Sequence, residues 1–516
     1  MIDLPAQDSK LDELDAPPAS WTDLRDVEGR SVSVAMTDSV DAHLRAHLLQ
    51  WGDRQEDLTF ALWTPSVGRT RLTALLHTLV LPEDGDRVLQ GNVAMTPKYV
   101  ERALARAVEE GCGIALLHSH CGPGWQAMSK DDAVAEGVRL AGAVATFTGL
   151  PLVGMTTGTD GTWSGRLWFH RGGRHYEPRW CESVRVIGDR LRSDFADFLV
   201  PPPAYREQFR RTQTVWGPIN HRQLARLRVG IVGLGSVGMA VAESLARSGV
   251  ERFVLLDFDE VQAHNLDRLQ GADNHRDEGR LKIEVAHDLI LRSSTAGQVT
   301  VLGAPYSVVE QQGYEVALDC DVLFSCVDRP RARQILNHVA YAHLIPVIDG
   351  GIAVRFRDGA FRGAEWQVQT VAPGRPCLEC LEAFDGGDVD TERHGLLEDP
   401  SYLRGLPDDH RLKRNENVVP FSANLASLEV LQWIGLAGGL PTLPASAVQR
   451  FHLVAGVLES DETRACRSGC ETAALVGTGD TAFRLTGFDH AAAKARLRQS
   501  ASSAGTTPAS TASPPP

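Results

Sequence analysis

Apolar residues recur in short blocks along the first third of the chain, and turn-forming residues separate the blocks. LTFALW (58–63), TRLTALLHTLVL (70–81) and GIALLHSH (113–120) have the length and apolar content of buried strands, and two more candidates cover 151–156 and 162–170. Thr96 followed by Pro97 is a typical helix start and predicts a helix through about residue 110. Strands interleaved with helices predict an α/β domain at 29–172.

A different pattern begins at Arg228. RVGIVGLGSVGMAVAESLARSGV (228–250) predicts a strand, a glycine-rich turn and a helix, and VLLDFD (254–259) predicts the next strand. This order begins a βαβ unit, so we expect a Rossmann-like α/β domain at 209–498. The intervening residues 173–208 are charged and contain three prolines at 201–203, which predicts a linker that is helical in parts.

The two ends of the chain have biased compositions. Residues 1–28 predict a flexible acidic lead, and 499–516, rich in Ser, Ala, Thr and Pro, predict a disordered tail. Neither a signal peptide nor a transmembrane run is expected, which favours a cytoplasmic protein. The formal net charge of −14 over 516 residues argues against nucleic acid or an anionic membrane as a partner.

The first candidate site lies in LLHSHCGPGWQAMSKDD (116–132). His118 and His120 are two apart on a predicted strand, so their side chains share one face, and Asp132 follows in the first turn of the next helix. Two imidazoles and a carboxylate suit zinc and leave a fourth position for water, whose pKa zinc lowers to about 7. The same residues also allow a simpler interpretation, because His-x-His arises by chance and Ser129-x-x-Asp132 is the pattern of a helix capping box.

The order His-Ser-His, a loop, then Ser-x-x-Asp resembles the JAMM motif of the JAB/MPN metallopeptidases. The resemblance implies a catalytic zinc on His118, His120 and Asp132, with Ser129 stabilising the oxyanion. It also implies an upstream glutamate as general base, for which Glu56 is the best match, although a glutamate before a strand is usually solvated surface.

Two features depart from the family pattern. Cys121 stands where the family usually has proline, and the loop between His120 and Ser129 is one residue longer than the common spacing. Cys121 is either a fourth zinc ligand that silences the site or a small loop residue.

The second candidate site begins with a G-x-G-x-x-G turn. Gly233, Gly235 and Gly238 let the backbone approach phosphates at a helix N-terminus, and Asp257 lies about 20 residues on, where an acidic residue meets ribose hydroxyls. This pattern alone suits an NAD or FAD enzyme equally well.

The following segments favour a different family. DFDEVQAHNLDRLQ (257–270), GRLKIEVA (279–286) and DVLFSCVDRPRAR (321–333) resemble the ThiF, MoeB and ubiquitin-activating enzymes in order and spacing. The resemblance implies that Asp257 and Asp259 belong to the nucleotide site, with Asp257 on the ribose. It places Asn265, Arg268 and Lys282 on the triphosphate and Asp328 on magnesium. In MoeB-like homodimers an arginine crosses the interface, and Arg211, or alternatively Arg210, has the matching offset. Ser236 and Arg329 replace a frequent glycine and a frequent asparagine of the family.

Four of the nine cysteines form two close pairs, which are Cys377 with Cys380 and Cys466 with Cys470. Such pairs predict a closed tetrahedral zinc site with a structural role. Residues 381–465 contain no cysteine, where ubiquitin-activating enzymes carry the one that forms a thioester. We therefore expect an adenylate without a thioester on this chain. Cys320 and Cys326 fall around a predicted strand and are expected in the core.

Together the two resemblances predict a bifunctional enzyme that acts on the C-terminus of a ubiquitin-like protein. One half would cut after the terminal glycine and the other would adenylate that carboxylate, with ATP, Mg²⁺ and two Zn²⁺ sites, as in bacterial ubiquitin-like modification systems. The expected partners are the ubiquitin-like protein, a conjugating enzyme and a second copy of the chain.

Three alternatives remain open. The adenylating half would activate a sulfur-carrier protein whose tail the peptidase trims. The JAB half would only bind the ubiquitin-like fold, as the Cys121 departure suggests. A nicotinamide-dependent oxidoreductase would leave the series Asn265, Arg268 and Lys282 unexplained.

Overall fold

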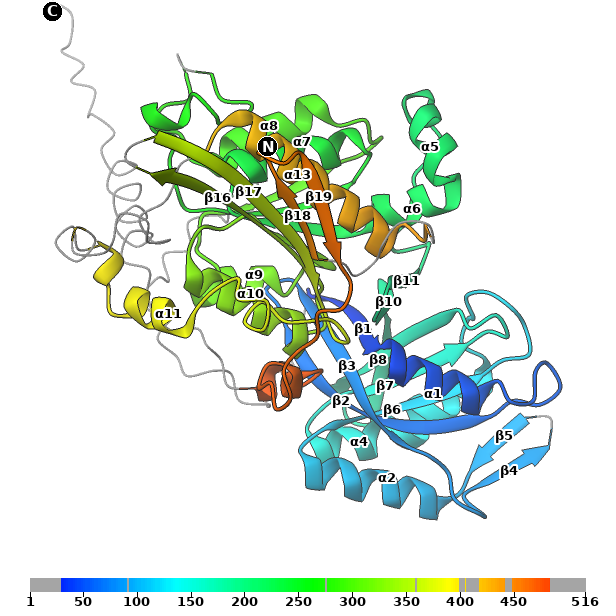
Figure 1. Ribbon diagram of the computed structural model, residues 1–516. Helices are drawn as coiled ribbons and strands as arrows, with labels where there is room; N and C mark the ends of the chain where they lie inside the picture. Colours follow the sequence, from blue (N-terminus) through cyan, green and yellow to red (C-terminus); the bar gives the residue numbers. More distant parts are fainter. Residues whose placement is uncertain are drawn as a thin grey trace, which may run out of the picture.

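A computed structural model describes residues 29–90, 92–273, 276–357, 360–398, 404, 417–440 and 448–482. The predicted flexible lead (1–28) and disordered tail (499–516) lie outside these ranges. Within them, no helix has both the length and the apolar character needed to cross a membrane. The described chain builds two large sheets that lie next to each other (Figure 1).

The first sheet has nine strands in the order β11-β10-β1-β3-β2-β6-β7-β8-β9. Its strands are β1 (Ser31–Thr37), β2 (Leu58–Val67), β3 (Arg71–Val80), β6 (Gly113–Ser119), β7 (Leu152–Thr157), β8 (Trp163–Gly172), β9 (His175–Trp180), β10 (Ser183–Ile187) and β11 (Leu191–Phe195). A separate hairpin joins β4 (Arg87–Gln90) to β5 (Asn92–Met95). The strands predicted from the apolar blocks are therefore present.

Helices cover both faces of this sheet, which is why its central strands are apolar on both sides. Ala61 and Trp63 of β2 pack with α1 (Asp38–Leu48), whereas Phe60 and Leu62 pack with α2 (Pro97–Glu110) and α4 (Ala141–Thr148). This alternation follows the two-residue period of a strand. Helix α2 begins at Pro97 and is capped after Glu110 by Gly111 in the left-handed conformation, which confirms the predicted helix.

The segment predicted to be a linker, 173–208, is largely part of the first sheet. Strands β9, β10 and β11 extend through Phe195, and helical structure begins only with η4 (Glu207–Phe209), α5 (Arg210–Trp216) and α6 (Pro218–Arg226). The charges in this segment suggested solvent exposure. Arg185 of β10 is instead fully buried beside Asp321, a residue more than a hundred positions away, and the sequence does not reveal that pairing.

The second sheet has eight strands in the order β14-β13-β12-β15-β16-β17-β18-β19. Its strands are β12 (Arg228–Val232), β13 (Arg252–Leu256), β14 (Thr300–Ala304), β15 (Val322–Ser325), β16 (Val347–Arg357), β17 (Ala360–Val371), β18 (Val448–His452) and β19 (Val457–Asp461). The first five strands in sheet order are parallel, and β17, β18 and β19 continue antiparallel. The Rossmann-like prediction is confirmed.

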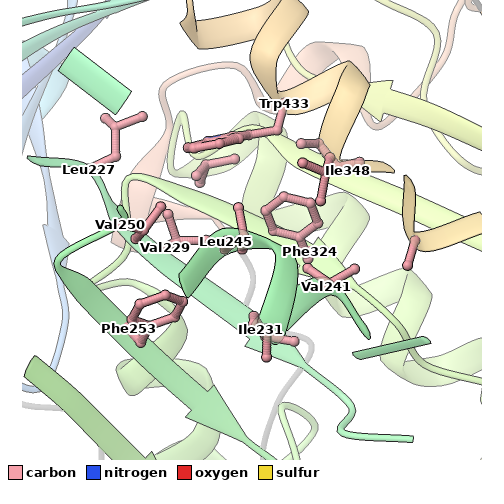
Figure 2. Packing of buried hydrophobic residues seen from close by; sticks show 14 of the residues in the cluster. Leu227, Val229, Ile231, Val241, Leu245, Val250, Phe253, Phe324, Ile348 and Trp433 are labelled. Carbon is pink, nitrogen blue, oxygen red and sulfur yellow. The ribbon is translucent and has the colours of Figure 1, made fainter. Parts of the chain in front are cut away.

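Helices also cover both faces of the second sheet. One face packs with α7 (Ser236–Arg247), α8 (Lys282–Ser293) and α13 (Val419–Ala437), and the other with α9 (Gln311–Ala317) and α10 (Pro330–Ala342). Figure 2 shows Val241 and Leu245 of α7 over Ile231 and Phe324 of the sheet, with Trp433 of α13 beside them. Helix α11 (Gly386–Arg393) lies next to α10 (Figure 1).

The two sheets share an interface rather than being joined only by a linker. The core around α7 also contains Leu75 of β3 and Ile187 of β10. Thr64 Oγ1 donates to the Gly477 carbonyl oxygen (2.6 Å), and Val67 N donates to Asp480 Oδ2 (2.8 Å). The segment after the second cysteine pair therefore binds the end of β2.

Candidate functional site

His118, His120 and Asp132 meet at the end of β6. His118 Nε2 lies 3.2 Å from His120 Nε2 and 3.1 Å from Asp132 Oδ1, and His120 Nε2 lies 3.3 Å from Asp132 Oδ2. A tetrahedral zinc with ligand distances of about 2.0–2.1 Å requires neighbouring ligand atoms about 3.3–3.4 Å apart. The three side chains therefore have the spacing of a zinc site, and all three ligand atoms lie within 4.8 Å of one another.

Asp132 also belongs to the helix cap that the sequence allowed as an alternative. Ser129 N donates to Asp132 Oδ2 (2.7 Å) and Asp132 N donates to Ser129 Oγ (3.1 Å), so the capping box and the metal-type cluster coexist. The box fixes the carboxylate at the start of α3 (Lys130–Ala133). Burial alone raises the pKa of Asp132, but hydrogen bonds with His118 and His120 outweigh it and lower that pKa. Asp132 in turn raises the pKa of His120.

Glu56 lies beside this cluster, and only Asp57 separates it from the start of β2. Burial raises the pKa of its carboxyl group, while the nearby His120 and His118 oppose the shift. A carboxylate with a raised pKa next to a candidate metal position suits a general base. Cys121 is exposed and is not part of the group of converging ligand atoms.

The glycine-rich turn has the close packing that its glycines predict. Gly233 has φ +88°, and a Cβ there would lie 2.6 Å from the Cys326 carbonyl oxygen. A Cβ on Gly238 would lie 2.0 Å from the Gly233 carbonyl oxygen, so the helix can approach the turn only with glycine at this position. A Cβ on Gly235 would meet no atom within 4 Å, which leaves this side of the turn open to a ligand at the N-terminus of α7.

Asp257, Asp259 and Lys282 form a charged group beside that turn. The Asp257 carboxylate accepts hydrogen bonds from Leu234 N (2.6 Å) and Asp259 N (2.7 Å), and Lys282 Nζ donates to Asp259 Oδ2 (2.9 Å). Burial raises the pKa of Asp257. Burial lowers the pKa of Lys282, but the carboxylates of Asp257 and Asp259 outweigh it, so that pKa is raised. The ammonium group therefore stays charged at neutral pH.

Of the other residues predicted to bind the nucleotide, Asp328 lies near this group, whereas Asn265 and Arg268 bond their sequence neighbours. Asp328 is exposed in the segment after β15 and lies near enough to Lys282 to contribute to its raised pKa. Asn265 and Arg268 make local contacts, since Asn265 Oδ1 accepts from Gln262 N (3.1 Å) and Arg268 donates to Asp267 Oδ1 (2.8 Å). The structure thus brings together the turn, both aspartates, Lys282 and Asp328, but it pairs Asn265 and Arg268 with their sequence neighbours.

Arg211 lies on α5, which Figure 1 draws at the outer edge of the molecule. Its side chain is exposed, and the neighbouring Arg210 pairs with Glu207 (3.0 Å). These positions leave both arginines on the surface of a single chain.

The four paired cysteines converge from the segments after β17 and after β19. Cys377 Sγ and Cys380 Sγ lie 3.6 and 3.7 Å from Cys470 Sγ, and all four sulfurs lie within 4.8 Å of one another. A tetrahedral zinc with Zn–S bonds of about 2.3 Å requires sulfurs about 3.8 Å apart. Backbone amides of Cys377 and Arg467 donate to Cys466 Sγ (3.2 Å) and Cys380 Sγ (3.4 Å). The group therefore fits a closed zinc site.

Three residues near the histidine cluster belong to none of the sequence motifs. Glu136, Arg166 and Thr156 are fully buried and connected, and Thr156 Oγ1 lies 3.4 Å from His118 Nε2. Arg166 stands in the apolar run WSGRLWF, and a charge inside such a strand requires a buried partner. That is the one signal from which the sequence could have indicated this group.

Comparison with known proteins identifies relatives of the second half. A model of the ThiF family matches residues 205–470. The molybdopterin-synthase adenylyltransferase of Escherichia coli K12 is 32% identical over 159 residues, which are 31% of this chain and 60% of that protein. The sulfur carrier protein ThiS adenylyltransferase of Bacillus subtilis 168 is 30% identical over 183 residues, which are 35% of this chain and 52% of that protein. Ubiquitin-like modifier-activating enzyme 5 of Caenorhabditis elegans is 26% identical over 178 residues, which are 32% of this chain and 40% of that protein.

These relatives are matched only in part. The chain spans 60%, 52% and 40% of their lengths. The crystal structure of E. coli MccB with ATP aligns with 52% of this chain and 74% of its own chain, at 18% identity and a TM-score of 0.39. The family match begins after β11, so the nine-stranded sheet lies outside it.

Proposed function

This chain belongs to the ThiF family, and from that premise we propose that its second half uses ATP to adenylate the C-terminal carboxylate of a ubiquitin-like or sulfur-carrier protein. The observation that carries the proposal is the group of Asp257, Asp259, Lys282 and Asp328 beside the open glycine turn. The named activities of the matched relatives, which act on molybdopterin synthase, ThiS or a ubiquitin-like modifier, support the same kind of substrate.

In this proposal a carboxylate oxygen of the partner's last residue attacks the α-phosphorus of ATP. The new bond joins that oxygen to phosphorus, the bond to the bridging oxygen breaks, and pyrophosphate leaves. Negative charge accumulates on the leaving phosphates, and preorganised cations stabilise it. Lys282 supplies one such cation, and Arg268 another once it exchanges Asp267 for phosphate. Asp257 would hold the ribose and Asp328 a Mg²⁺ ion, which neutralises phosphate charge when bound.

The adenylate would be passed on without a thioester on this chain, because residues 381–465 contain no cysteine. Burial raises the pKa of the thiols of both Cys320 and Cys326. Both side chains therefore stay protonated at neutral pH and are poor nucleophiles. A conjugating enzyme's thiol or a sulfur donor would then receive the acyl group. Arg211 would act across a homodimer interface, since its exposed position on α5 leaves it free to reach a second copy.

For the first half we propose a zinc metallopeptidase of the JAB/MPN kind. The supporting observation is the tetrahedral spacing of His118, His120 and Asp132, with Glu56 beside them. Zinc, when bound, supplies Lewis acidity and makes water a nucleophile at neutral pH. Glu56 would take the proton of the attacking water and return it to the leaving amine, and Ser129 would stabilise the oxyanion. On this proposal the JAB/MPN-like domain extends from residue 29 through β11, rather than ending at residue 172 as expected from the sequence.

The two activities would act on one object, the tail of the partner protein. The peptidase exposes or releases a terminal glycine, and the second half activates the same carboxylate. The deciding experiment is ATP–pyrophosphate exchange by the full chain with candidate ubiquitin-like proteins that end in glycine. Exchange that requires both ATP and a glycine-terminated partner supports adenylation, and its absence with every such partner contradicts it.

Two further assays separate the downstream alternatives. A thiocarboxylate formed on addition of sulfide, without transfer to a conjugating enzyme, would assign the chain to sulfur-carrier activation. A non-reducing gel tests whether a thioester forms between the partner and a cysteine of this chain. A reducible adduct of the partner on this chain that disappears on mutation of one cysteine would overturn the direct transfer.

A further inference from the structure

Three polar side chains connect the glycine turn to the start of α13. Asn417 Nδ2 donates a hydrogen bond to Ser236 Oγ (2.9 Å), and Ser422 Oγ also donates to Ser236 Oγ (2.9 Å). Ser422 Oγ lies 2.9 Å from Asn417 Oδ1 as well, which closes the group. Ser236 and Ser422 are buried, and none of the three residues belongs to the charged group of the nucleotide site.

Ser236 is the first residue of α7 and directly follows Gly235. The first backbone N–H groups of a helix have no partner within the helix, and together they attract anions. A Cβ on Gly235 would meet no atom within 4 Å, so the turn is open on this side. A triphosphate bound at this helix N-terminus would therefore have oxygens close to Ser236.

The direction of these hydrogen bonds determines what the Ser236 hydroxyl group can do. A side-chain amide nitrogen only donates, so Ser236 Oγ accepts from Asn417. Ser422 Oγ donates to the same oxygen. The proton of Ser236 is used in neither bond, and it has no other acceptor among the residues that the structure describes. It is therefore available to a ligand.

Ser422 has only one proton, which can point to Ser236 Oγ, to Asn417 Oδ1 or to the Val418 carbonyl oxygen. When it points to Asn417, the Ser236 hydroxyl group can donate to Ser422 Oγ instead. A phosphate oxygen is the stronger acceptor, because charge-assisted hydrogen bonds are roughly twice as strong as neutral ones. A bound phosphate would therefore take the Ser236 proton in either arrangement, while Asn417 continues to hold the Ser236 oxygen.

We propose that Ser236 is a phosphate-binding residue of the nucleotide site, and that Asn417 and Ser422 are positioning residues that direct its hydroxyl proton at the phosphate. The inference rests on the proposed adenylation site. The serine adds a donor that glycine, the frequent residue of the family at this position, lacks. Ser236 is 9% exposed, so part of it stays accessible to a ligand. A hydroxyl group that only tied α13 to α7 would not distinguish a phosphate-bearing ligand from one without phosphate.

The test is nucleotide binding by the full chain, measured by isothermal titration with ATP and with adenosine. Ser236→Ala removes the hydroxyl group, and Ser236→Gly is a second variant in case alanine does not fold. Losing one hydrogen bond to a charged group typically weakens binding about 10–100-fold. We expect about tenfold weaker binding of ATP for either variant. Binding of adenosine should not change, because adenosine has no phosphate, whereas a distorted turn would weaken both ligands.

A double-mutant cycle tests the positioning role. Asn417→Ala should weaken ATP binding less, by about threefold, because the Ser236 hydroxyl group stays present and loses only its orientation. Added to Ser236→Ala, it should cause no further loss, since the group that Asn417 orients is then absent. The matched control is Ser244→Ala on α7. The Ser244 hydroxyl group donates to the Ala240 carbonyl oxygen (2.8 Å), so this variant should bind both ligands as wild type.

Three results would contradict the inference in different ways. If Ser236→Ala binds ATP as tightly as wild type, or loses ATP and adenosine equally, the phosphate contact is wrong. If Asn417→Ala weakens ATP binding by the same factor with and without Ser236→Ala, Asn417 acts independently and its positioning role is wrong. If the wild-type chain itself binds no ATP, the proposed adenylation site fails and the inference with it.

Discussion

Arg71 Nη1 of β3 lies 2.6 Å from Asp321 Oδ1 of the second half, and the two side chains are only 1% and 2% exposed. Asp321 also accepts a hydrogen bond from Arg228 N (2.8 Å), at the start of the strand that leads into the glycine turn. The Asp321 carboxylate thus connects β3 of the first sheet to β12 of the second sheet. The two halves therefore pack as one body around a buried ion pair.

Removing one partner of this pair should destabilise the whole chain. Arg71→Met leaves a buried carboxylate, and such losses cost about 3–5 kcal/mol of the free energy of unfolding, with Arg185 nearby keeping the cost at the lower end. Urea unfolding measures the change. Adding Asp321→Asn to Arg71→Met should recover part of it. Arg106→Met, which breaks an exposed pair with Glu110, should change little, and an equal loss there would contradict the interpretation.

Stability should fall on mild acidification because of His338, a buried residue of α10. Burial lowers the pKa of His338 from 6.5 to about 4 in the folded chain. The unfolded chain therefore takes up this proton first, so stability is complete above about pH 6.5 and is lost as the pH falls toward 4. The loss from this group amounts to at most about 3 kcal/mol at 1.36 kcal/mol per pKa unit.

The measurement is the free energy of unfolding between pH 7 and 4. His338→Leu should flatten its pH dependence over this range, whereas the exposed His43→Leu should leave the slope as in wild type. An unchanged slope in His338→Leu would show that other groups cause the acid sensitivity.

The adenylation site predicts a loss of exchange without a loss of fold. Lys282→Ala removes a cation that would stabilise the phosphate charge, and Asp328→Ala removes the carboxylate that would hold Mg²⁺. In each variant ATP–pyrophosphate exchange should fall about 10²–10³-fold. Lys98→Ala, on the surface of α2, is the matched control and should keep full exchange. Exchange that survives both site variants would show that the nucleotide binds elsewhere.

If the proposed metallopeptidase site is correct, two variants should lose cleavage for different reasons. His120→Ala removes a ligand, so the chain should lose one zinc and all cleavage of a glycine-terminated precursor. Glu56→Gln removes only the base, so it should keep that zinc and lose cleavage. Zinc analysis and a gel assay of the precursor give both readouts. Glu101→Gln on α2 should cleave normally, and cleavage by Glu56→Gln would remove the base assignment.

The cysteine group predicts a link between metal and stability. Cys377→Ser should lose one zinc and melt at a lower temperature, because a closed metal site contributes directly to the free energy of folding. The segment after Cys470 also bonds Thr64 and Val67 of β2, so the loss should loosen the contact between the halves, which limited proteolysis detects. Exposed Cys121→Ser should keep both zincs, and a lost zinc there would restore Cys121 as a ligand.

Short-range geometry explains what could be predicted from the sequence. His118 and His120 share a face because strand side chains alternate, and Gly233 and Gly238 are required by a turn that closes within six residues. The ThiF-type half could be predicted because its motif residues occur in a fixed order along the successive strands and helices from β12 to β15. The family match confirms this half. The JAB/MPN resemblance of the first half stays a prediction, supported by geometry alone.

The local elements, the glycine turn, the cysteine pairs and the two histidines could be predicted from the sequence, because each depends on backbone periods or spacings of a few residues. Which distant groups meet depends on how the sheets and helices pack. The tertiary structure placed β9 to β11 in the sheet, paired Arg71 with Asp321, and brought Glu136, Arg166 and Thr156 together under His118. A buried charge has to find a partner, but the partner is set by how sheets and helices pack, and no spacing along the chain encodes it.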